Sequence, residues 1–325
     1  MLIRKTLALV AAGALSALAT TSAYAQSWDM PTPYAPSNFH TVNIDHFTAA
    51  VKQATGGKLV ITVHPGASLY KMPEIKRAVQ TRQVPIGEVL MVTLVNDNPL
   101  YAVDGLPFLA NSYAEARKLW TVQRPYIESV LDAQGLKLLF AVPWPPQGLM
   151  TAKEIKSVAD LEGLNFRAYD KQTSRLGELI KARPVTIQAA EVAQALATGK
   201  INALTSSAQS GVDYKAWESL KYFYDVQAWL PKNMVIVNAA AFNALDKGTQ
   251  DILLAEAKKA EEAGWKSSRE VAEATKKTLA ENGMKVLPPS PQLVADFNRI
   301  GKQMVDEWLA GAGPDGKAIV DAYRK

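Results

Sequence analysis

The chain of 325 residues contains no cysteine. This absence excludes disulfide bonds, a lipid attached to an N-terminal cysteine, and every zinc site built on thiolate ligands. The three histidines, His40, His46 and His64, stand in unrelated contexts without the spacing of metal ligands. We therefore expect neither a metal site nor a cofactor.

The sequence also lacks the short motifs that accompany common catalytic and nucleotide-binding sites. It has no G-x-S-x-G elbow, no G-x-x-x-x-G-K-[ST] loop, and no G-x-G-x-x-G after a predicted strand. The paired carboxylates Glu261 and Glu262 fall in an alanine-rich helical pattern, which is typical of a solvated helix face. The sequence accordingly favours a protein that is not an enzyme.

An excess of charge of one sign is missing as well, and so are long apolar runs beyond the N-terminus. There are 36 basic and 31 acidic residues, scattered along the chain, which argues against a nucleic-acid partner. After residue 25, no apolar stretch reaches the length of a membrane span. We expect a protein that is not embedded in a membrane. The balanced charge and the lack of a heptad seam favour a monomer.

The first 25 residues form a separate unit. Arg4 and Lys5 precede an apolar run over residues 7–19, and Ala23-Tyr24-Ala25 follows. A basic start, a short apolar centre and an A-x-A site are typical of a cleavable secretory signal. An exported chain without disulfides fits the bacterial periplasm.

From residue 26 onward, strand and helix patterns alternate. This rhythm predicts an α/β fold whose parallel sheets are covered by helices on both faces. A helical pattern between about residues 246 and 282 would be about 50 Å long, which exceeds one small lobe, so we expect it to bridge two lobes. The other predicted elements are strands at 27–30, 59–64, 135–144 and 233–242 and helices at 39–54, 171–182 and 189–198.

Prolines mark the places where the chain should cross between lobes. Pro145-Pro146 follows the strand at 135–144, and Pro231 precedes the strand at 233–242. Since single cores stop growing at roughly 250–300 residues, two lobes suit this length. We expect lobe I to comprise residues 26–142 and 232–268, and lobe II residues 143–231 and 269–325.

The segment LNFRAY, residues 164–169, places an arginine inside a predicted strand. Its alternation puts Arg167 on the same face as Asn165 and Tyr169. One interpretation is a strand edge at which Arg167 pairs with a carboxylate such as Asp160, Glu162 or Asp170. The other is a ligand site at the strand end, where a guanidinium matches a carboxylate with two parallel hydrogen bonds. The segment alone leaves both open.

Over nearly its whole length after the signal, the chain resembles the solute-binding proteins of tripartite ATP-independent periplasmic (TRAP) transporters, of the dicarboxylate-binding type. The matching segments are, in order, ATGGKLVITVHPGASL, YAVDGLPFLANSYAEA, SVADLEGLNFRAYD, EVAQALATGKINAL and NMVIVNAAAFNAL. The resemblance implies a two-lobed, type II-like periplasmic binding protein with a long bridging helix and no enzymatic activity. It also implies delivery of an organic acid to a membrane permease. In that family the arginine of the DLxGLxxR segment clamps the ligand carboxylate, and here that arginine is Arg167.

Two departures from the family pattern bear on the ligand. Many members carry a second basic residue just after the first crossing, but residues 142–152 contain neither Arg nor Lys. The acidic residues that members often carry in the segment at 199–207 are absent too. Both changes predict a monocarboxylate that is aromatic, heterocyclic or a 2-oxo acid, such as phenylglyoxylate or pyroglutamate. The alternatives are a C4-dicarboxylate receptor, a protein that presents ligand to a membrane sensor, and a secreted enzyme.

Eight further residues complete the predicted site. Aromatic walls with a few polar points are typical of small-ligand sites. Ordinary packing is the alternative for the apolar members, and a solvated strand end is the alternative for the acid. The predicted residues are Trp144, Met150, Tyr169 and Trp229 for the walls, Ser206, Ser207 and Asn233 for polar contacts, and Glu88 on the facing wall.

Overall fold

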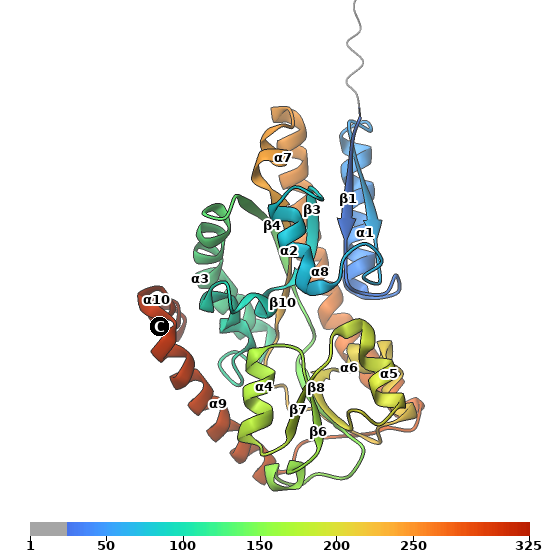
Figure 1. Cartoon of the computed structure of the whole chain (residues 1–325), viewed down its shortest axis with the longest axis vertical. Coiled ribbons are helices and arrows are strands. Elements are labelled where there is room, and N and C mark those ends of the chain that lie inside the picture. Colours follow the sequence, from blue (N-terminus) through green and yellow to red (C-terminus); the bar gives the residue numbers. More distant parts are fainter. Residues whose placement is uncertain (1–24) are drawn as a thin grey trace, which may run out of the picture.

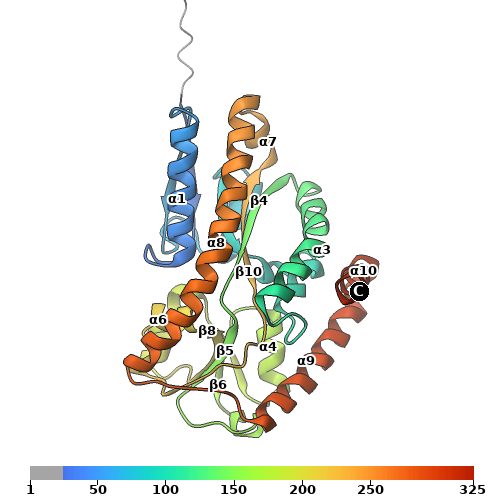
Figure 2. The same cartoon turned by 180° about the vertical axis from the view of Figure 1, so that it is seen from behind.

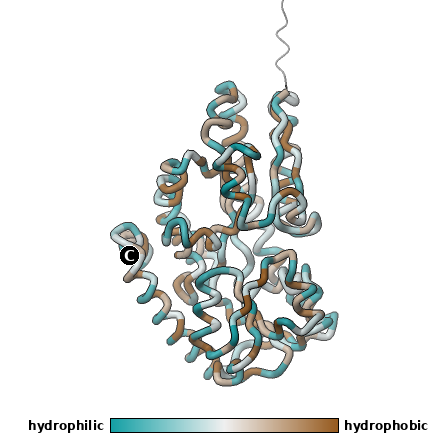
Figure 3. Tube along the Cα trace, viewed as in Figure 1, coloured by the Kyte–Doolittle hydropathy of each residue, from teal (hydrophilic) through white to brown (hydrophobic). Residues whose placement is uncertain are grey.

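The computed structural model describes residues 25–325, so the predicted signal sequence lies outside the described residues except for Ala25. Figures 1 and 2 show two lobes, one above the other, with α8 running through both. This is the expected two-lobed α/β architecture. Hydrophobic and hydrophilic residues alternate along the trace (Figure 3), and within residues 25–325 no helix combines the length and apolar character needed to cross a membrane.

The upper lobe holds two small sheets. In the first, β1 (Gln26–Pro31) and β2 (Leu59–His64) run parallel, connected through α1 (Phe39–Ala54). In the second, β10 (Lys232–Asn238) lies between two strands and is antiparallel to both. The expectation of parallel sheets is wrong here, because β10 returns from the lower lobe and enters the sheet in the opposite direction. The remaining elements of this lobe are α2 (Met72–Gln80), β3 (Ile86–Leu90), the 3-10 helices η1 (Met91–Leu94) and η2 (Pro99–Gly105), α3 (Tyr113–Asp132), β4 (Leu136–Pro143) and α7 (Ala239–Asn243).

The lower lobe is built on one mixed sheet of six strands. Their order is β11-β9-β5-β8-β6-β7, with β6 parallel to β7 and β8 while β5 is antiparallel to β8 and β9. Parallel strands place their carboxyl ends at the same edge, which here faces the upper lobe. The elements are β5 (Gln147–Thr151), η3 (Val158–Leu161), β6 (Asn165–Ala168), α4 (Lys171–Leu179), β7 (Arg183–Thr186), η4 (Ala189–Glu191), α5 (Val192–Ala197), β8 (Ala203–Ser207), α6 (Ala208–Asp213), η5 (Ala216–Glu218), β9 (Tyr222–Tyr224) and β11 (Lys285–Leu287).

The helix α8 (Lys247–Glu281) has 35 residues and begins after Asp246, whose side chain accepts from the Thr249 backbone N–H. It contacts α1 and β4 in the upper lobe and α6 in the lower one (Figure 2). It packs tightly against β4 at Gly264, where a Cβ atom would stand 2.4 Å from a methyl carbon of Val142. The expected bridge between the lobes is therefore present.

Two helices, α9 (Pro291–Gly311) and α10 (Gly313–Arg324), end the chain. The start of α9 packs in the lower lobe through Leu293 and Phe297. From there α9 runs along the lower lobe toward the upper lobe, where α10 packs on α3 (Figure 1). The division of the chain into lobes I and II remains a prediction. It assigns α10 to lobe II, and in the structure α10 contacts α3, η2 and α9.

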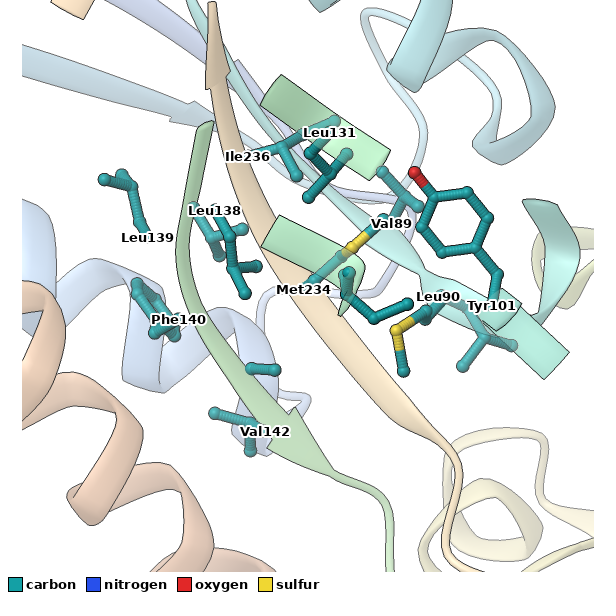
Figure 4. Close-up of a cluster of buried hydrophobic side chains, with 14 of the residues drawn as sticks. Val89, Leu90, Tyr101, Leu131, Leu138, Leu139, Phe140, Val142, Met234 and Ile236 are labelled. Atoms are coloured by element: carbon teal, nitrogen blue, oxygen red, sulfur yellow. The ribbon is translucent and has the colours of Figure 1, made fainter. Parts of the chain in front are cut away.

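The core of the upper lobe is formed where β10 lies between its two neighbours. Figure 4 shows Met234 and Ile236 of β10 packed among apolar side chains of β3, β4, η2 and α3. Both side chains are fully buried. This core fixes the ends of β3, β4 and β10, and these ends meet the lower lobe.

Candidate functional site

A cavity lies between the lobes, beside the carboxyl ends of β6 and β8 and next to both crossing segments. Its empty volume is about 400 Å³ when the open solvent at its mouth is included. Its lining combines aromatic and apolar walls with a few polar groups and one cation. The lining residues are Tyr34, Met72, Leu90, Trp144, Gln147, Arg167, Tyr169, Gln188, Ala189, Ser206, Ser210, Tyr214 and Pro231.

Arg167 is the third residue of β6, and only 4% of its surface is exposed. Its Nε donates to the Ile187 carbonyl oxygen at 3.0 Å, which fixes the guanidinium plane. The guanidinium carbon lies 4.9 Å from the centre of the Tyr169 ring and 5.9 Å from that of Tyr214. Within residues 25–325, no carboxylate oxygen lies within 4.0 Å of its nitrogens. Burial of a cation without an acidic partner costs several kcal/mol, so the arrangement calls for an anion from outside the protein.

The acids near Arg167 in the sequence are engaged elsewhere. Asp170 caps α4 by accepting from the Thr173 backbone N–H at 2.7 Å. Asp160 accepts from the backbone N–H groups of Lys156 and Ser157, at 2.9 Å each. The strand-edge ion pair considered above is therefore not formed.

The upper wall of the cavity contains two aromatic rings held by one amide. The rings of Tyr34 and Trp144 lie edge to face, with centroids 5.0 Å apart. The Asn233 Oδ1 accepts from the Trp144 indole N–H at 2.9 Å and from the Tyr34 hydroxyl at 3.1 Å. Burial, with the nearby Glu88, holds the pKa of Tyr34 well above its ordinary value of 10, so the hydroxyl stays a neutral donor.

Glu88 lies behind this wall, on β3. Its Oε1 accepts from the Asn233 Nδ2 at 2.8 Å, and its Oε2 accepts from the Thr32 hydroxyl. Burial raises the pKa of this carboxyl to about 7 against the opposing effect of the two donors. The His40 Nδ1 lies 3.6 Å from Oε1, and burial lowers the pKa of this imidazole well below 6.5. With this imidazole neutral, Glu88 has no cationic partner among the residues that the structure describes.

The structure brings four of the nine predicted residues together at the cavity: Arg167, Trp144, Tyr169 and Ser206.

The other five lie behind the lining. Ser207 caps α6 by accepting from the Ser210 backbone N–H at 3.1 Å. Met150 and Trp229 are packed in the two apolar clusters of the lower lobe. Asn233 and Glu88 face one another in the polar network of the upper lobe.

Sequence reasoning missed most of the polar lining, notably Tyr34, Gln147, Ser210 and Tyr214. Two of them had a local signal, because Tyr34 stands in the proline-rich segment PTPYAP and Gln147 follows Pro145-Pro146 directly. Tyr214 follows α6, and burial raises the pKa of its hydroxyl although the Arg167 cation opposes this. It thus offers a neutral donor beside the guanidinium.

Residues 34–311 match the family model described as bacterial extracellular solute-binding protein, family 7 (DctP). The chain belongs to this family. The match confirms the resemblance drawn from the sequence segments, and the two-lobed fold agrees with it. Family 7 proteins act outside the cytoplasm as receptors for solutes.

Two solved structures of solute receptors are similar over nearly the whole described chain. DctP6 of Bordetella pertussis, an extracytoplasmic solute receptor that binds pyroglutamic acid, is 49% identical with a TM-score of 0.91. The alignment covers 92% of this chain and 99% of DctP6. A TRAP solute-binding protein from a marine metagenome, crystallised with co-purified pyroglutamate, is 43% identical with a TM-score of 0.90, covering 92% and 99% of the two chains.

A curated relative is more distant. The solute-binding protein of Albidiferax ferrireducens is 23% identical over 217 residues, which are 65% of this chain and 64% of that protein. The chain thus spans just under two thirds of this relative's length.

Proposed function

We propose that this chain captures pyroglutamate, or a monocarboxylate of similar size with a polar ring, between its lobes and delivers it to a TRAP-type membrane permease. The observation that carries the proposal is Arg167, a buried cation on the cavity wall without an acidic partner in residues 25–325. Two receptors that are 43% and 49% identical and bind pyroglutamate support this ligand class.

In the proposed complex the ligand carboxylate meets the terminal Nη atoms of Arg167. The Nε of this side chain is already engaged with Ile187, which turns the two terminal nitrogens toward the carboxylate. The neutral Tyr214 hydroxyl beside the guanidinium is a third donor. A planar fork and a hydroxyl together match the two oxygens of one carboxylate.

The lactam ring of pyroglutamate presents one N–H donor and one carbonyl acceptor. Gln147 donates its Nε2 to the Pro145 carbonyl oxygen at 2.9 Å, which leaves its Oε1 as an acceptor for the lactam N–H. The Ser206 and Ser210 hydroxyls, which also line the cavity, offer donors for the lactam carbonyl. Tyr34, Trp144 and Tyr169 enclose the apolar ring carbons.

The charge of the lining favours one carboxylate rather than two. Arg167 is the sole basic side chain among the described residues that line the cavity. A second ligand carboxylate would therefore be buried without a cation, at a cost of several kcal/mol. This argument ranks a monocarboxylate above the C4-dicarboxylate alternative.

The proposal includes export by the predicted signal at residues 1–25, action as a monomer in the periplasm, and no chemistry on the ligand. The last point is tested by incubating the protein with pyroglutamate and recovering the acid unchanged. A hydrolysed or otherwise modified product would make the protein an enzyme.

The binding proposal is tested by calorimetry on the exported protein, unfolded and refolded to remove any ligand acquired during expression. We expect pyroglutamate to bind at one site, and Arg167→Ala to weaken binding about a hundredfold or more, since the ligand carboxylate loses its charged partner in a dry site. Arg183→Ala on the neighbouring strand β7, where the side chain is exposed, is the matched control. Equal affinity of wild type and Arg167→Ala would contradict the proposal.

A further inference from the structure

We propose that Asn233 is a positioning residue of the ligand site, which determines how well the receptor discriminates between ligand rings without touching the ligand. This inference rests on the proposed function. Asn233 is the second residue of β10, is 2% exposed, and is absent from the cavity lining. It acts through Trp144 and Tyr34, which do line the cavity.

A single oxygen atom of Asn233 holds both aromatic side chains. Its Oδ1 is 2.9 Å from the Trp144 Nε1 and 3.1 Å from the Tyr34 hydroxyl oxygen. Tyr34 follows β1, Trp144 stands in the first crossing segment, and Asn233 begins the return strand. One amide therefore ties together three segments at the place where the lobes meet.

Trp144 determines which way the amide faces. An indole N–H only donates hydrogen bonds, so the Asn233 Oδ1 must face Trp144, and the Nδ2 on the other side donates to the Glu88 Oε1. The Thr32 hydroxyl donates to the other oxygen of Glu88 and holds the carboxylate from the far side. These hydrogen bonds therefore allow only one orientation of the Asn233 amide.

This geometry gives Arg167 and Asn233 different roles in ligand binding. Arg167, on the lower lobe, serves the carboxylate that all candidate ligands share. The two rings held by Asn233 contact the part of the ligand in which candidates differ. Loss of the Asn233 oxygen should thus change the preference among acids of equal charge, whereas loss of Arg167 should weaken all of them.

The decisive variants differ in whether they keep the acceptor oxygen. Asn233→Leu removes it and keeps the number and branching of side-chain heavy atoms. Asn233→Asp keeps an acceptor oxygen for Trp144 and Tyr34. The second oxygen of the new carboxylate can accept the proton that Glu88 holds near neutral pH. Ile236→Ala, on the same strand but packed in the apolar core, is the control for simple destabilisation.

The affinities of L- and D-pyroglutamate are measured by calorimetry for each variant. We expect Asn233→Leu to weaken L-pyroglutamate binding about tenfold and to reduce the ratio of the two affinities. Asn233→Asp at pH 6 should restore most of that ratio. Ile236→Ala should lower the melting temperature and leave the ratio unchanged. An unchanged ratio in Asn233→Leu, or an equal change in Ile236→Ala, overturns the proposal.

A second measurement, on the ligand-free protein, tests the positioning role of Asn233 independently of the proposed function. The seven tryptophans are labelled with ¹⁵N in the indole ring, and the signal missing from Trp144→Phe is assigned to Trp144. We expect this indole N–H to exchange slowly with solvent in wild type and Asn233→Asp, and to shift and exchange faster in Asn233→Leu. An unchanged Trp144 signal in Asn233→Leu excludes the positioning role, whereas intact signals without pyroglutamate binding contradict only the proposed function.

Discussion

The Asn38 side chain, which precedes α1, donates to the Asp213 carboxylate at the end of α6 with a distance of 2.7 Å between Nδ2 and Oδ2. The two helices belong to the upper and lower lobes (Figure 1), so this hydrogen bond crosses the space between them. Burial raises the pKa of Asp213, and two side-chain donors oppose this shift. Neither residue lines the cavity, so this bond joins the two lobes outside the candidate ligand site.

The first prediction concerns this bond. Asp213→Ala should weaken ligand binding about three- to tenfold by loss of one hydrogen bond to a charged group in the closed form. The loss should appear in the dissociation rate, measured by stopped-flow tryptophan fluorescence. Gln209→Ala is the control, because Gln209 donates to the same carboxylate at 2.7 Å from within α6. Wild-type dissociation in Asp213→Ala would mean that the contact does not hold the lobes together.

The second prediction concerns pH. Burial raises the pKa of Glu88 from 4.5 to about 7, so the folded chain holds a proton that the unfolded chain has released over this range. Stability contributed by the protonated form is complete below about pH 4.5 and is lost as the pH rises through about 7. At about 1.4 kcal/mol per pH unit, the loss is about 3 kcal/mol.

The measurement for this prediction is urea unfolding of wild type and Glu88→Gln at pH 5 and pH 8. The glutamine variant does not titrate, so the difference in unfolding free energy between the two proteins isolates Glu88. We expect wild type to lose stability relative to Glu88→Gln on going to pH 8. A difference that is independent of pH would show that the carboxyl does not titrate in this range.

The third prediction concerns a buried ion pair beside the second crossing. Lys232 is fully buried, and its Nζ lies 3.4 Å from the Asp104 Oδ2, which also accepts from the Lys232 backbone N–H at 2.8 Å. Removal of one partner strands a charge, so Lys232→Met should cost about 3–5 kcal/mol of unfolding free energy. Asp104→Asn combined with Lys232→Met should recover part of that loss. Chemical denaturation measures both, and additive effects of the two changes would argue against the pair.

The fourth prediction concerns the contact between α8 and β4. Gly264→Ala should destabilise the protein by about 1–3 kcal/mol, because the added Cβ overlaps Val142. Combining it with Val142→Ala should relieve the overlap. Gly311→Ala, in a helix position with no neighbouring atom within 4 Å of the added carbon, should be neutral or stabilising by up to about 1 kcal/mol. The measurement is the melting temperature of wild type, Gly264→Ala, the double variant with Val142→Ala, and Gly311→Ala.

Much of the architecture was accessible from the sequence because it depends on local patterns. The 59–64 strand and the long helix α8 follow from residue periodicity and caps, and both agree with the structure. The direction of β10 was not accessible, because strand pairing over separations of about 90 to 150 residues leaves no mark on the pairing segments. The contact of α10 with α3 was not predicted either, because packing between helices far apart in the sequence also leaves no local pattern.

The site shows the same limit. Alternation along β6 identifies Arg167 as an unusual residue, and the family segment gave it a role. Alternation along β8 places Ser206 and Ser207 on opposite faces, but only the tertiary structure shows that Ser206 reaches the cavity and Ser207 caps α6. Asn233 and Glu88 are polar residues of buried strands, and the sequence cannot tell whether such groups serve a ligand or one another.

The most direct measurement is a crystal structure of the exported protein with pyroglutamate bound. The account predicts the ligand carboxylate within hydrogen-bonding distance of both terminal nitrogens of Arg167, with the lactam ring against Trp144 and Tyr34. A ligand carboxylate bound elsewhere, with Arg167 paired to a protein acid or turned to solvent, would contradict it.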